Sequence, residues 1–440
     1  MTVLYEVNEK GAYSNIALNR QLEAGKLQGV DRAFVTELVY GVLKWKLTID
    51  LTIKKFSSIR LKKISPWILN ILRLGVYQLL YTSKVPESAA CNESVKLASK
   101  HGHNASAGFV NAVLRNIARN RDSLKLTDGI TDKVKYLSIK YSHPEWMVAR
   151  FVELFGPEFT EGLLDADNAT PEFTVRTNSL RSTAGQLAEE LAAEGVETAP
   201  GRYGGGALLL KSPSSVTKLA AFRKGLFQVQ DESSMLAARV LDPGPGELVI
   251  DMCSAPGGKA THIAQLMGNK GAVLARDVFE HKVKLIEEAA QRLGIDIIRA
   301  EVYDSSVPDP VYAAKADRVL LDAPCTGLGI LRRKPDIRWS REIEDGKPIR
   351  ELQSALLRAA ASYLKPGGVM VYSTCTILPE ENGGVVRDFL KENGGFALDD
   401  ITPHLPAELA GYVEDGGMLQ LYPNRDGVDG FFIARLRKRG

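Results

Sequence analysis

Residues 248–259 constrain the fold more than any other part of this chain. The apolar run 248–250 ends in an acidic residue, Asp251, and a Pro-Gly-Gly turn at 256–258 then leads into a helical pattern at 260–266. Strand, glycine turn and helix in this order predict an α/β fold with a ligand at the strand's carboxyl end. Glycines let the backbone come close to a ligand because they carry no Cβ. The alternative is a tight turn that holds no ligand.

The spacing around this turn gives information about the ligand. The turn lacks the Gly-x-Gly-x-x-Gly pattern of dinucleotide sites. An acidic strand end before Pro-Gly-Gly-Lys favours a cationic sulfonium cofactor instead. A second predicted strand, 271–277, ends at Asp277, roughly 20 residues after the turn, where such folds place the carboxylate that binds a ribose diol.

Two more predicted strands run into cysteines. The apolar segment 316–322 is followed by Ala-Pro-Cys325, and the segment 367–372 is followed by Ser-Thr-Cys375. Since carboxyl ends of parallel strands share one edge of a sheet, we expect both cysteines on the cofactor side.

These motifs together resemble the S-adenosylmethionine-dependent RNA cytosine carbon-5 methyltransferases. The resemblance rests on Asp-x-Cys-x-Ala-Pro-Gly-Gly-Lys at 251–259, Asp-Ala-Pro-Cys-Thr-Gly at 322–327 and Ser-Thr-Cys-Thr at 373–376, which occur in this order. Further matches lie at 332–339, 379–382, 424–432 and 227–234.

The resemblance implies covalent catalysis. Carbon 5 of cytosine is a poor nucleophile, and addition of a thiolate to carbon 6 makes it reactive. By resemblance Cys375 is that nucleophile and Cys325 assists product release. DNA cytosine methyltransferases use the cysteine of a Pro-Cys pair, which Cys325 would supply, so the residues alone leave the two roles open. Asp322 would lie near the base and, if burial raised its pKa, could donate a proton to the ring.

The resemblance also implies a cofactor site and no metal. Asp277 should hold the ribose hydroxyls and Asp304 the adenine. The predicted cofactor-binding residues are Cys253, Ser254, Ala255, Pro256, Gly257, Gly258, Lys259, Asp277, Asp304 and Asp322. No group of histidines and cysteines has metal-ligand spacing.

Composition bounds the rest of the prediction. The 440 residues are enough for two or three domains, and 45% of them are hydrophobic. No apolar run is long enough for a membrane span, and residues 1–6 do not resemble a secretory signal, so we expect a cytoplasmic protein. Four cysteines in a chain of this length do not form a disulfide framework, and we expect free thiols.

Charge is distributed unevenly along the chain. Residues 1–150 hold 23 Lys and Arg against 12 Asp and Glu, a balance of +11, whereas the remainder has a balance of −8. Such asymmetry indicates that one part meets a polyanion. The densest basic stretch comprises Lys44, Lys46, Lys54, Lys55, Arg60, Lys62 and Lys63. A second set follows Cys325 and could hold phosphates: Arg332, Arg333, Lys334, Arg338 and Arg341. A solvated surface is the alternative for both sets.

The first 140 residues have helical periodicity. Asp31 is a candidate N-cap for a helix with Phe34 on its apolar face, and Ser65-Pro66 starts another helix. Segments 72–79 and 109–115 resemble the NusB-like RNA-binding domain. Cys91 is expected in its core.

We therefore predict a multidomain protein. It would have an all-α NusB-like domain at 1–140, a connecting helix and small α/β subdomain at 141–230, and an α/β class I, Rossmann-like methyltransferase domain at 231–440. This combination is similar to the RsmB, Sun or Fmu family of small-subunit ribosomal RNA methyltransferases. It implies 16S ribosomal RNA as partner, naked or in a partly assembled subunit, no membrane, S-adenosylmethionine as cofactor and a monomer.

Two other functions fit the same predicted fold. An amino-group methyltransferase would need no cysteine nucleophile, but its usual Asn/Asp-Pro-Pro-aromatic motif is not what stands at 322–325. An RNA-binding assembly or antitermination factor with an inactive methyltransferase fold would not need the cysteine pair or the Pro-Gly-Gly-Lys turn.

Overall fold

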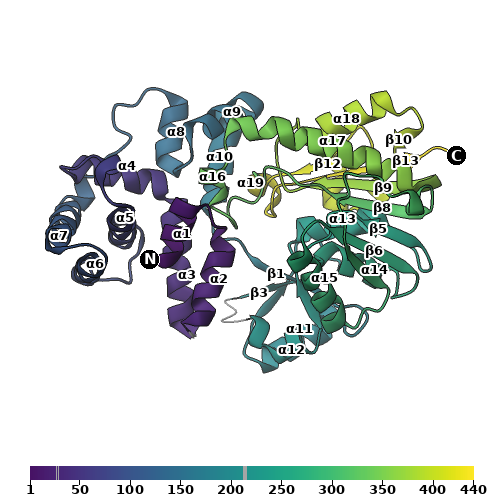
Figure 1. Ribbon diagram of the computed structural model, residues 1–440, viewed down its shortest axis with the longest axis horizontal. Coiled ribbons are helices and arrows are strands. Elements are labelled where there is room, and N and C mark those ends of the chain that lie inside the picture. Colours follow the sequence, from purple (N-terminus) through teal and green to yellow (C-terminus); the bar gives the residue numbers. More distant parts are fainter. Residues whose placement is uncertain (26, 28, 212–215) are drawn as a thin grey trace. The chain divides into compact units, whose positions relative to one another are not determined.

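The computed structural model describes residues 1–25, 27, 29–211 and 216–440. The chain forms two compact units (Figure 1). The first contains Met1–Thr170 and Leu331–Ile343, and the second contains Pro171–Ile330 and Glu344–Gly440. In the described part of the chain, no helix is long and apolar enough to cross a membrane.

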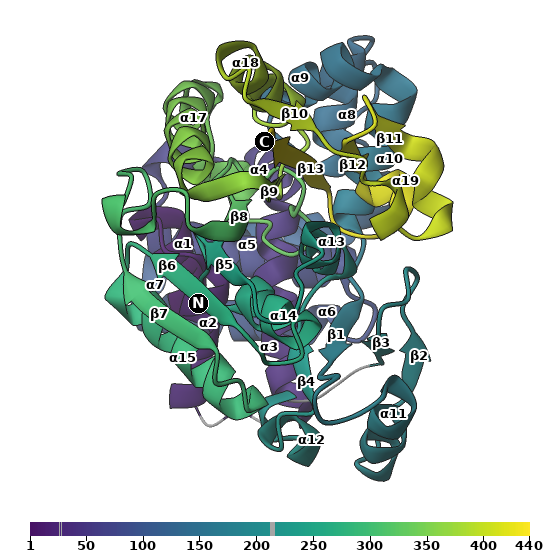
Figure 2. The same ribbon diagram turned by 90° about the vertical axis from the view of Figure 1, so that its right-hand side faces the viewer.

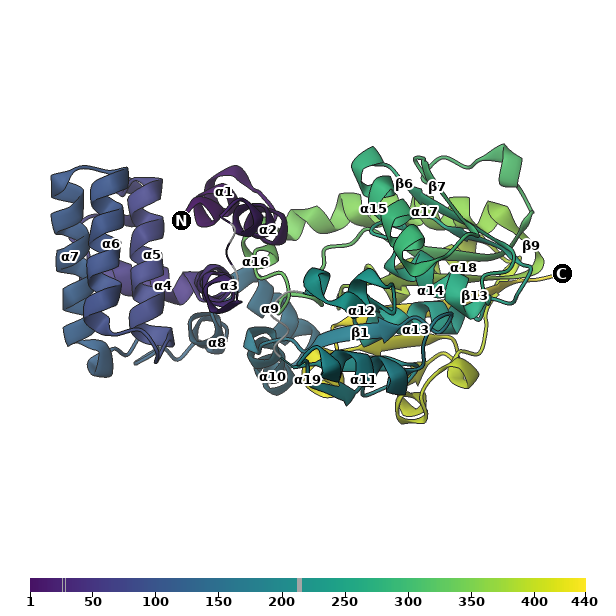
Figure 3. The ribbon, with the colours of Figure 1, turned by 90° about the horizontal axis from the view of Figure 1, so that it is seen from below.

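The first unit is helical, as predicted. Its neighbouring helices α5, α6 and α7 pack side by side (Figure 3). The helices are α1 (Thr2–Lys10), α2 (Ser14–Ala24), α3 (Gly29–Lys44), α4 (Lys46–Phe56), α5 (Pro66–Tyr81), α6 (Glu87–His101), α7 (Asn104–Arg119), α8 (Lys133–Tyr141), α9 (Glu145–Phe155), α10 (Pro157–Asn168) and α16 (Ile337–Ser340).

Most of the apolar periodicity of this unit marks its core. Ser65 is the N-cap residue of α5 with Pro66 at the first position, and Cys91 is buried, both as expected. Two details were wrong. Helix α3 already begins at Gly29, so Asp31 lies within its first turn instead of capping it. Phe34, which we expected on the core face, is 36% exposed.

A short segment from the middle of the catalytic half belongs to the helical unit. Leu331–Ile343, which follows the Cys325 strand, contains α16 and packs among residues of α3, α8 and α10. Helices α9 and α10, which lie where we expected a connecting helix, are also part of this unit.

The second unit begins with a small α/β subdomain. Its four-stranded antiparallel sheet has the order β2-β3-β1-β4. Strands β1 and β3 and helix α11, which starts with a capping box at Thr183 and Gln186, make this a mixed α/β subdomain. The elements are β1 (Phe173–Thr177), α11 (Ala184–Ala193), β2 (Thr198–Pro200), β3 (Ala207–Leu210), α12 (Ala220–Arg223) and β4 (Phe227–Val229).

A nine-stranded sheet forms the rest of this unit, with the order β11-β12-β13-β9-β8-β5-β6-β7 and β10 paired to β13 (Figure 2). Strands β5 to β9 are parallel, and β13 pairs antiparallel with β9. The strands are β5 (Leu248–Asp251), β6 (Ala272–Asp277), β7 (Ile298–Val302), β8 (Ala316–Asp322), β9 (Leu364–Thr374), β10 (Phe396–Leu398), β11 (Val413–Glu414), β12 (Met418–Leu421) and β13 (Phe431–Lys438).

Helices cover both faces of this sheet, so its central strands are buried on both sides. Val249 packs in the cluster with α13, α14 and α15, whereas Ile250 packs in the cluster with α17 and α18. The chain order reverses between β5 and β8, and such a switch point is where doubly wound folds bind ligands. The helices are α13 (Glu232–Leu241), α14 (Gly258–Leu266), α15 (Glu280–Leu293), α17 (Gly346–Tyr363), α18 (Gly383–Glu392) and α19 (Pro423–Asp426).

Candidate active site

Two cysteines meet where β8 and β9 end. These strands are parallel neighbours in which Asp322 is in register with Ser373, so the loops that follow them lie at one edge of the sheet. The Sγ atoms of Cys325 and Cys375 are 3.3 Å apart. The structure therefore brings together the two thiols that the sequence places 50 residues apart.

A buried polar network fixes both cysteine loops. The hydroxyls of Thr326 and Thr376, each next to a cysteine, lie 2.9 Å apart. The Glu381 carboxylate accepts hydrogen bonds from the Thr326 amide at 2.9 Å and from Gln353 Nε2 at 3.2 Å. Burial raises the pKa of Glu381. The sequence matched the family at 379–382, but no role was predicted for Glu381.

The same network changes the protonation of one thiol. This thiol is Cys325. The contact with Cys375 and the burial of the side chain both raise the pKa of Cys325 well above the usual value, and the nearby Glu381 adds to this effect. Cys325 therefore keeps its proton at neutral pH and can donate it to Cys375 Sγ.

Asp322 lies between the cysteines and the cofactor turn. Its Oδ2 accepts a hydrogen bond from Lys259 Nζ at 2.7 Å, and its Oδ1 accepts one from the Ser373 hydroxyl at 2.8 Å. The Lys259 ammonium also lies 5.1 Å from the ring centre of Phe431. Lys259 and Asp322, which come from different motifs, thus form one ion pair.

The Pro-Gly-Gly-Lys turn adopts a conformation that requires glycine. Gly257 has φ +93° and immediately precedes α14. A Cβ on Gly257 would stand 3.1 Å from the Cα of Ile286 in α15. Glycine at this position therefore allows both the left-handed backbone and the close packing of α14 against α15.

The turn contains buried polar atoms that have no hydrogen-bond partner among the described residues. They are both carboxyl oxygens of Asp251 and the Ser254 hydroxyl. Burial, together with the neighbouring Asp322 and Asp277 carboxylates, raises the pKa of Asp251 to about 7. Unsatisfied buried acceptors are rare in folded proteins and fit a site completed by a ligand that donates hydrogen bonds. A cationic ligand suits them best, because it would also satisfy the charge of Asp251.

The remaining predicted cofactor residues line the neighbouring strand ends. Asp277 ends β6, and its Oδ1 accepts a hydrogen bond from the Phe279 amide at 3.1 Å. Asp304 follows β7 and is exposed, with its Oδ1 bonded to Ser306. Burial and the Asp251 carboxylate raise the pKa of Cys253, so this thiol is protonated. These positions fit side chains that line a ligand.

Comparison with known proteins identifies the family. Residues 238–437 match the 16S rRNA methyltransferase RsmB/F family, 1–119 the NusB family, and 143–217 the ferredoxin-like domain of RsmF/B-like methyltransferases. The chain is 40% identical over 443 residues to a probable ribosomal RNA small subunit methyltransferase B of Bacillus subtilis, with 100% of this chain and 98% of the relative covered. The chain belongs to the RsmB/F family.

Other relatives support this assignment. A protein of Synechocystis with the same description is 36% identical, with 99% of this chain and 98% of the relative covered. Among solved structures, that of PH0851 has a TM-score of 0.85 at 30% identity and covers 99% of this chain and 97% of its own. The structure of NSun6 from Pyrococcus horikoshii with SFG, an analogue of S-adenosylmethionine, has a TM-score of 0.59 at 26% identity and covers 66% and 97%.

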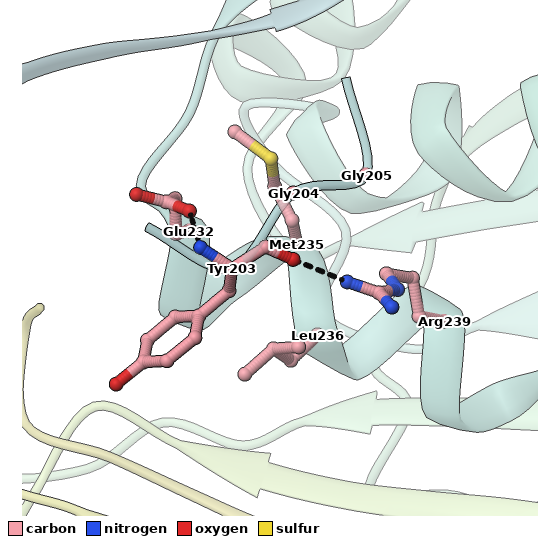
Figure 4. Close-up of a pocket in the computed structure, with 7 residues that line it drawn as sticks. All are labelled: Tyr203, Gly204, Gly205, Glu232, Met235, Leu236 and Arg239. Atoms are coloured by element: carbon pink, nitrogen blue, oxygen red, sulfur yellow. Dashed lines mark hydrogen bonds between the residues drawn. The ribbon is translucent and has the colours of Figure 1, made fainter. Parts of the chain in front are cut away.

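A separate pocket of this RsmB/F chain is drawn in Figure 4. The Glu232 carboxylate accepts hydrogen bonds from the amides of Arg202 and Tyr203, and Arg239 donates to the Tyr203 carbonyl at 3.1 Å. Both charged residues therefore hold the loop of the small subdomain against α13. The residues that line this pocket do not include any predicted site residue.

Several basic residues that we expected on an RNA-binding surface are buried or half-buried within the first unit. The Arg338 guanidinium is 0% exposed and donates to backbone carbonyls and to Asn168 Oδ1, so it is not available for phosphate. Lys44 donates to the Asn168 carbonyl, and burial lowers its pKa to about 8. Lys46 lies 4.9 Å from the ring centre of Trp339. Lys54, Lys55, Arg60, Lys62 and Lys63 are exposed.

Proposed function

We propose that this RsmB/F chain transfers a methyl group from S-adenosylmethionine to carbon 5 of a cytosine in 16S ribosomal RNA. The observation that carries this proposal is the 3.3 Å approach of Cys325 and Cys375 beside the Lys259–Asp322 pair. Two thiols at the carboxyl edge of the sheet are not needed for transfer to an amino group. They suit chemistry in which a thiolate adds to the base and is later released.

The cofactor site uses the residues described above. Asp277 would bind the ribose hydroxyls and Asp304 the adenine. The turn Cys253–Lys259 would hold the methionine end, with the unsatisfied Asp251 carboxyl facing positive charge. The bound cofactor supplies the methyl cation equivalent. Among the described residues no cluster could hold a metal ion, and the proposed chemistry needs none.

The first step forms the bond between protein and RNA. A cytosine that is unpaired or flipped out of its stack would enter beside Asp322. The Cys375 thiolate adds to carbon 6, and the ring nitrogen takes up a proton through Asp322, whose carboxylate receives it from the Lys259 ammonium that donates to its Oδ2. The negative charge of the thiolate is thereby neutralised, and carbon 5 becomes an enamine carbon that can take the methyl group.

The last step breaks the bond to Cys375. Cys325, which keeps its proton, donates that proton to the departing Cys375 sulfur. The resulting Cys325 thiolate takes the proton from carbon 5, the double bond between carbons 5 and 6 forms again, and the ring nitrogen returns its proton through Asp322 to Lys259. Both cysteines end as thiols. The one proton that methylation releases from carbon 5 is now bound to Cys325, whose own proton has passed to Cys375, which started as a thiolate.

The proposal is tested by comparing wild type with Cys375→Ala and Cys325→Ala. Transfer from labelled S-adenosylmethionine to 16S ribosomal RNA is measured, and a denaturing gel detects protein bound covalently to RNA. We expect Cys375→Ala to give neither methylation nor adduct, whereas Cys325→Ala accumulates the adduct. The opposite pattern would make Cys325 the nucleophile. Full activity in both variants would exclude the covalent mechanism and favour transfer to an amino group.

A non-enzymatic function is tested in the same experiment. If wild type binds S-adenosylmethionine and methylates the RNA, an inactive assembly or antitermination factor is excluded. A comparison of naked 16S ribosomal RNA with partly assembled subunits then shows which one is the substrate.

A further inference from the structure

Arg176 is a buried cation in the small subdomain for which the described residues offer no acidic partner. Its side chain is 1% exposed on β1. Its guanidinium donates to Gln265 Oε1 at 2.8 Å, to Gln230 Oε1, to the Gly258 carbonyl at 2.7 Å and to Thr261 Oγ1 at 3.0 Å. All four acceptors are neutral. A buried charge is ordinarily paired with an opposite charge, because leaving it unpaired is costly.

The position of Arg176 increases this cost. Gly258, Thr261 and Gln265 all belong to α14, and Gly258 is its first residue. The beginning of a helix carries about half a positive charge, so this position is electrostatically unfavourable for the guanidinium. The nearby Arg292 adds more positive charge and, after burial, is the second cause that lowers the pKa of Arg176 to about 9.

Among the described residues, no carboxylate contacts Arg176 or is a cause of its pKa shift. The ring of His262 on α14 is buried, and burial, Arg176 and Arg239 lower its pKa well below the usual value, so it is neutral. Arg239 and Arg292 add positive charge to this region, and the Glu232 carboxylate, which acts on the pKa of Arg239, offsets part of it. Positive potential therefore accumulates behind the Pro-Gly-Gly-Lys turn, where the first amide groups of α14 have no partner within the helix.

We propose that Arg176 is a positioning residue that holds the cofactor turn from behind and supplies the positive potential that selects the methionine carboxylate of S-adenosylmethionine. This inference rests on the proposed function, because it assumes that the turn binds this cofactor. The carboxylate is the one negative charge of the cofactor. Asp251, on one side of the turn, would face the positive charge of the cofactor's methionine end. The Arg176 side would face its carboxylate. The two opposite charges would thus fix the orientation of the methionine end in the turn.

The test uses a pair of ligands that differ by one group. Decarboxylated S-adenosylmethionine keeps the sulfonium and the amine but lacks the carboxylate. Dissociation constants of both ligands are measured by calorimetry for wild type, Arg176→Met and Arg176→Lys. We expect wild type to bind S-adenosylmethionine at least tenfold more tightly than the decarboxylated ligand. Arg176→Met should lose most of this preference by weakening the first ligand about tenfold while changing the second less than twofold.

Arg176→Lys is the matched control, because it keeps the positive charge but cannot form all the hydrogen bonds that the guanidinium makes to Gln230 and α14. It should retain the preference for the carboxylate, even where a displaced turn weakens both ligands together. An equal loss of both ligands in Arg176→Met would show a purely structural role and overturn the inference. So would a wild type that binds both ligands equally, and that measurement does not depend on whether any variant folds.

The outcome separates this inference from the proposed function. If wild type binds neither ligand, the cofactor assignment itself fails. If wild type binds and methylates but shows no preference for the carboxylate, only the role of Arg176 fails.

Discussion

Asp251 is the residue whose protonation depends most on what the turn holds. Burial raises its pKa from 3.8 to about 7, although the nearby Ser254 hydroxyl acts to lower it, and neither of its oxygens meets a donor of the described residues with full hydrogen-bond geometry. Because the folded value exceeds the unfolded one, its contribution to stability is lost as the pH rises from about 4 to about 7. A bound cation would favour the ionised form of Asp251 and so restore the stability that is lost in this pH range.

Cofactor binding should therefore depend on pH through Asp251. Below pH 7 the carboxyl must lose its proton to face a cation, so the affinity for S-adenosylmethionine should weaken roughly tenfold between pH 6.5 and 5.5. Asp251→Asn should bind the cofactor at least about tenfold more weakly at pH 8 and should lose this pH dependence. Calorimetry between pH 5.5 and 8 measures both. An Asp251→Asn variant with the wild-type pH profile would assign the titration to another group.

The residues of the site differ in how far the sequence predicts them. Cys325 and Cys375 follow short apolar runs bounded by turn residues, a pattern typical of buried parallel strands, so the sequence predicts their common edge of the sheet. The unpaired state of Arg176 cannot be read from the sequence. It depends on which side chains of α14 face β1, and that is settled by packing between segments about 85 residues apart.

Glu381 connects elements and so gives a prediction about both cysteine loops. Glu381→Gln keeps the shape but replaces one carboxylate oxygen by an amide nitrogen, which accepts no hydrogen bond. The side chain can then no longer accept from both the Thr326 amide and the Thr326 hydroxyl. We expect a loss of methyl transfer of about tenfold or more with cofactor affinity within twofold of wild type. Glu380→Gln, at the adjacent position, is the control. If Glu381→Gln retains full activity, the network does not position the cysteines.

At the scale of elements, the segment Leu331–Ile343 is the least predictable part of the chain. Its sequence contains many cationic residues, which suggested a surface, and local periodicity cannot reveal that Arg338 is buried in the other unit. The contacts explain the burial. Trp339 Nε1 donates to the Leu43 carbonyl at 2.6 Å, and Ser14 Oγ bonds to Asp336. The helical unit is thus completed by residues that follow β8.

Arg338 should accordingly stabilise the first unit. Arg338→Met leaves the carbonyls of Lys44 and Asp167 without their donor and should lower the free energy of unfolding by about 3 kcal/mol. Urea unfolding followed by tryptophan fluorescence measures this, because all four tryptophans belong to the first unit: Trp45, Trp67, Trp146 and Trp339. Lys334→Ala, at an exposed position of the same segment, should leave the midpoint unchanged. An equal midpoint for Arg338→Met would refute this role.

For the molecule as a whole, the asymmetry of charge separates two tasks. The acidic remainder contains the strand ends that would hold a cationic cofactor, and the basic first 150 residues would hold the RNA. Composition predicts this division because net charge needs no knowledge of folding. The structure reduces the set of candidate RNA-binding cations. In the densest basic stretch, Lys44 and Lys46 are half-buried within the first unit, and the exposed cations begin at Lys54.

Exposed lysines of the first unit should govern the salt dependence of RNA binding. Each phosphate contact that is lost lowers the slope of log affinity against log salt by about 0.7 to 0.9, because one fewer counterion is released. If all four lysines contact phosphate, reversing Lys54, Lys55, Lys62 and Lys63 to Glu should reduce the slope by about 3 and weaken binding at low salt most. The control reverses four exposed lysines of the second unit: Lys211, Lys284, Lys315 and Lys391. This control changes the net charge by the same amount. An equal loss of slope in both variants would mean that RNA binding responds to total charge. A loss confined to the first variant locates the phosphate contacts on the helical unit.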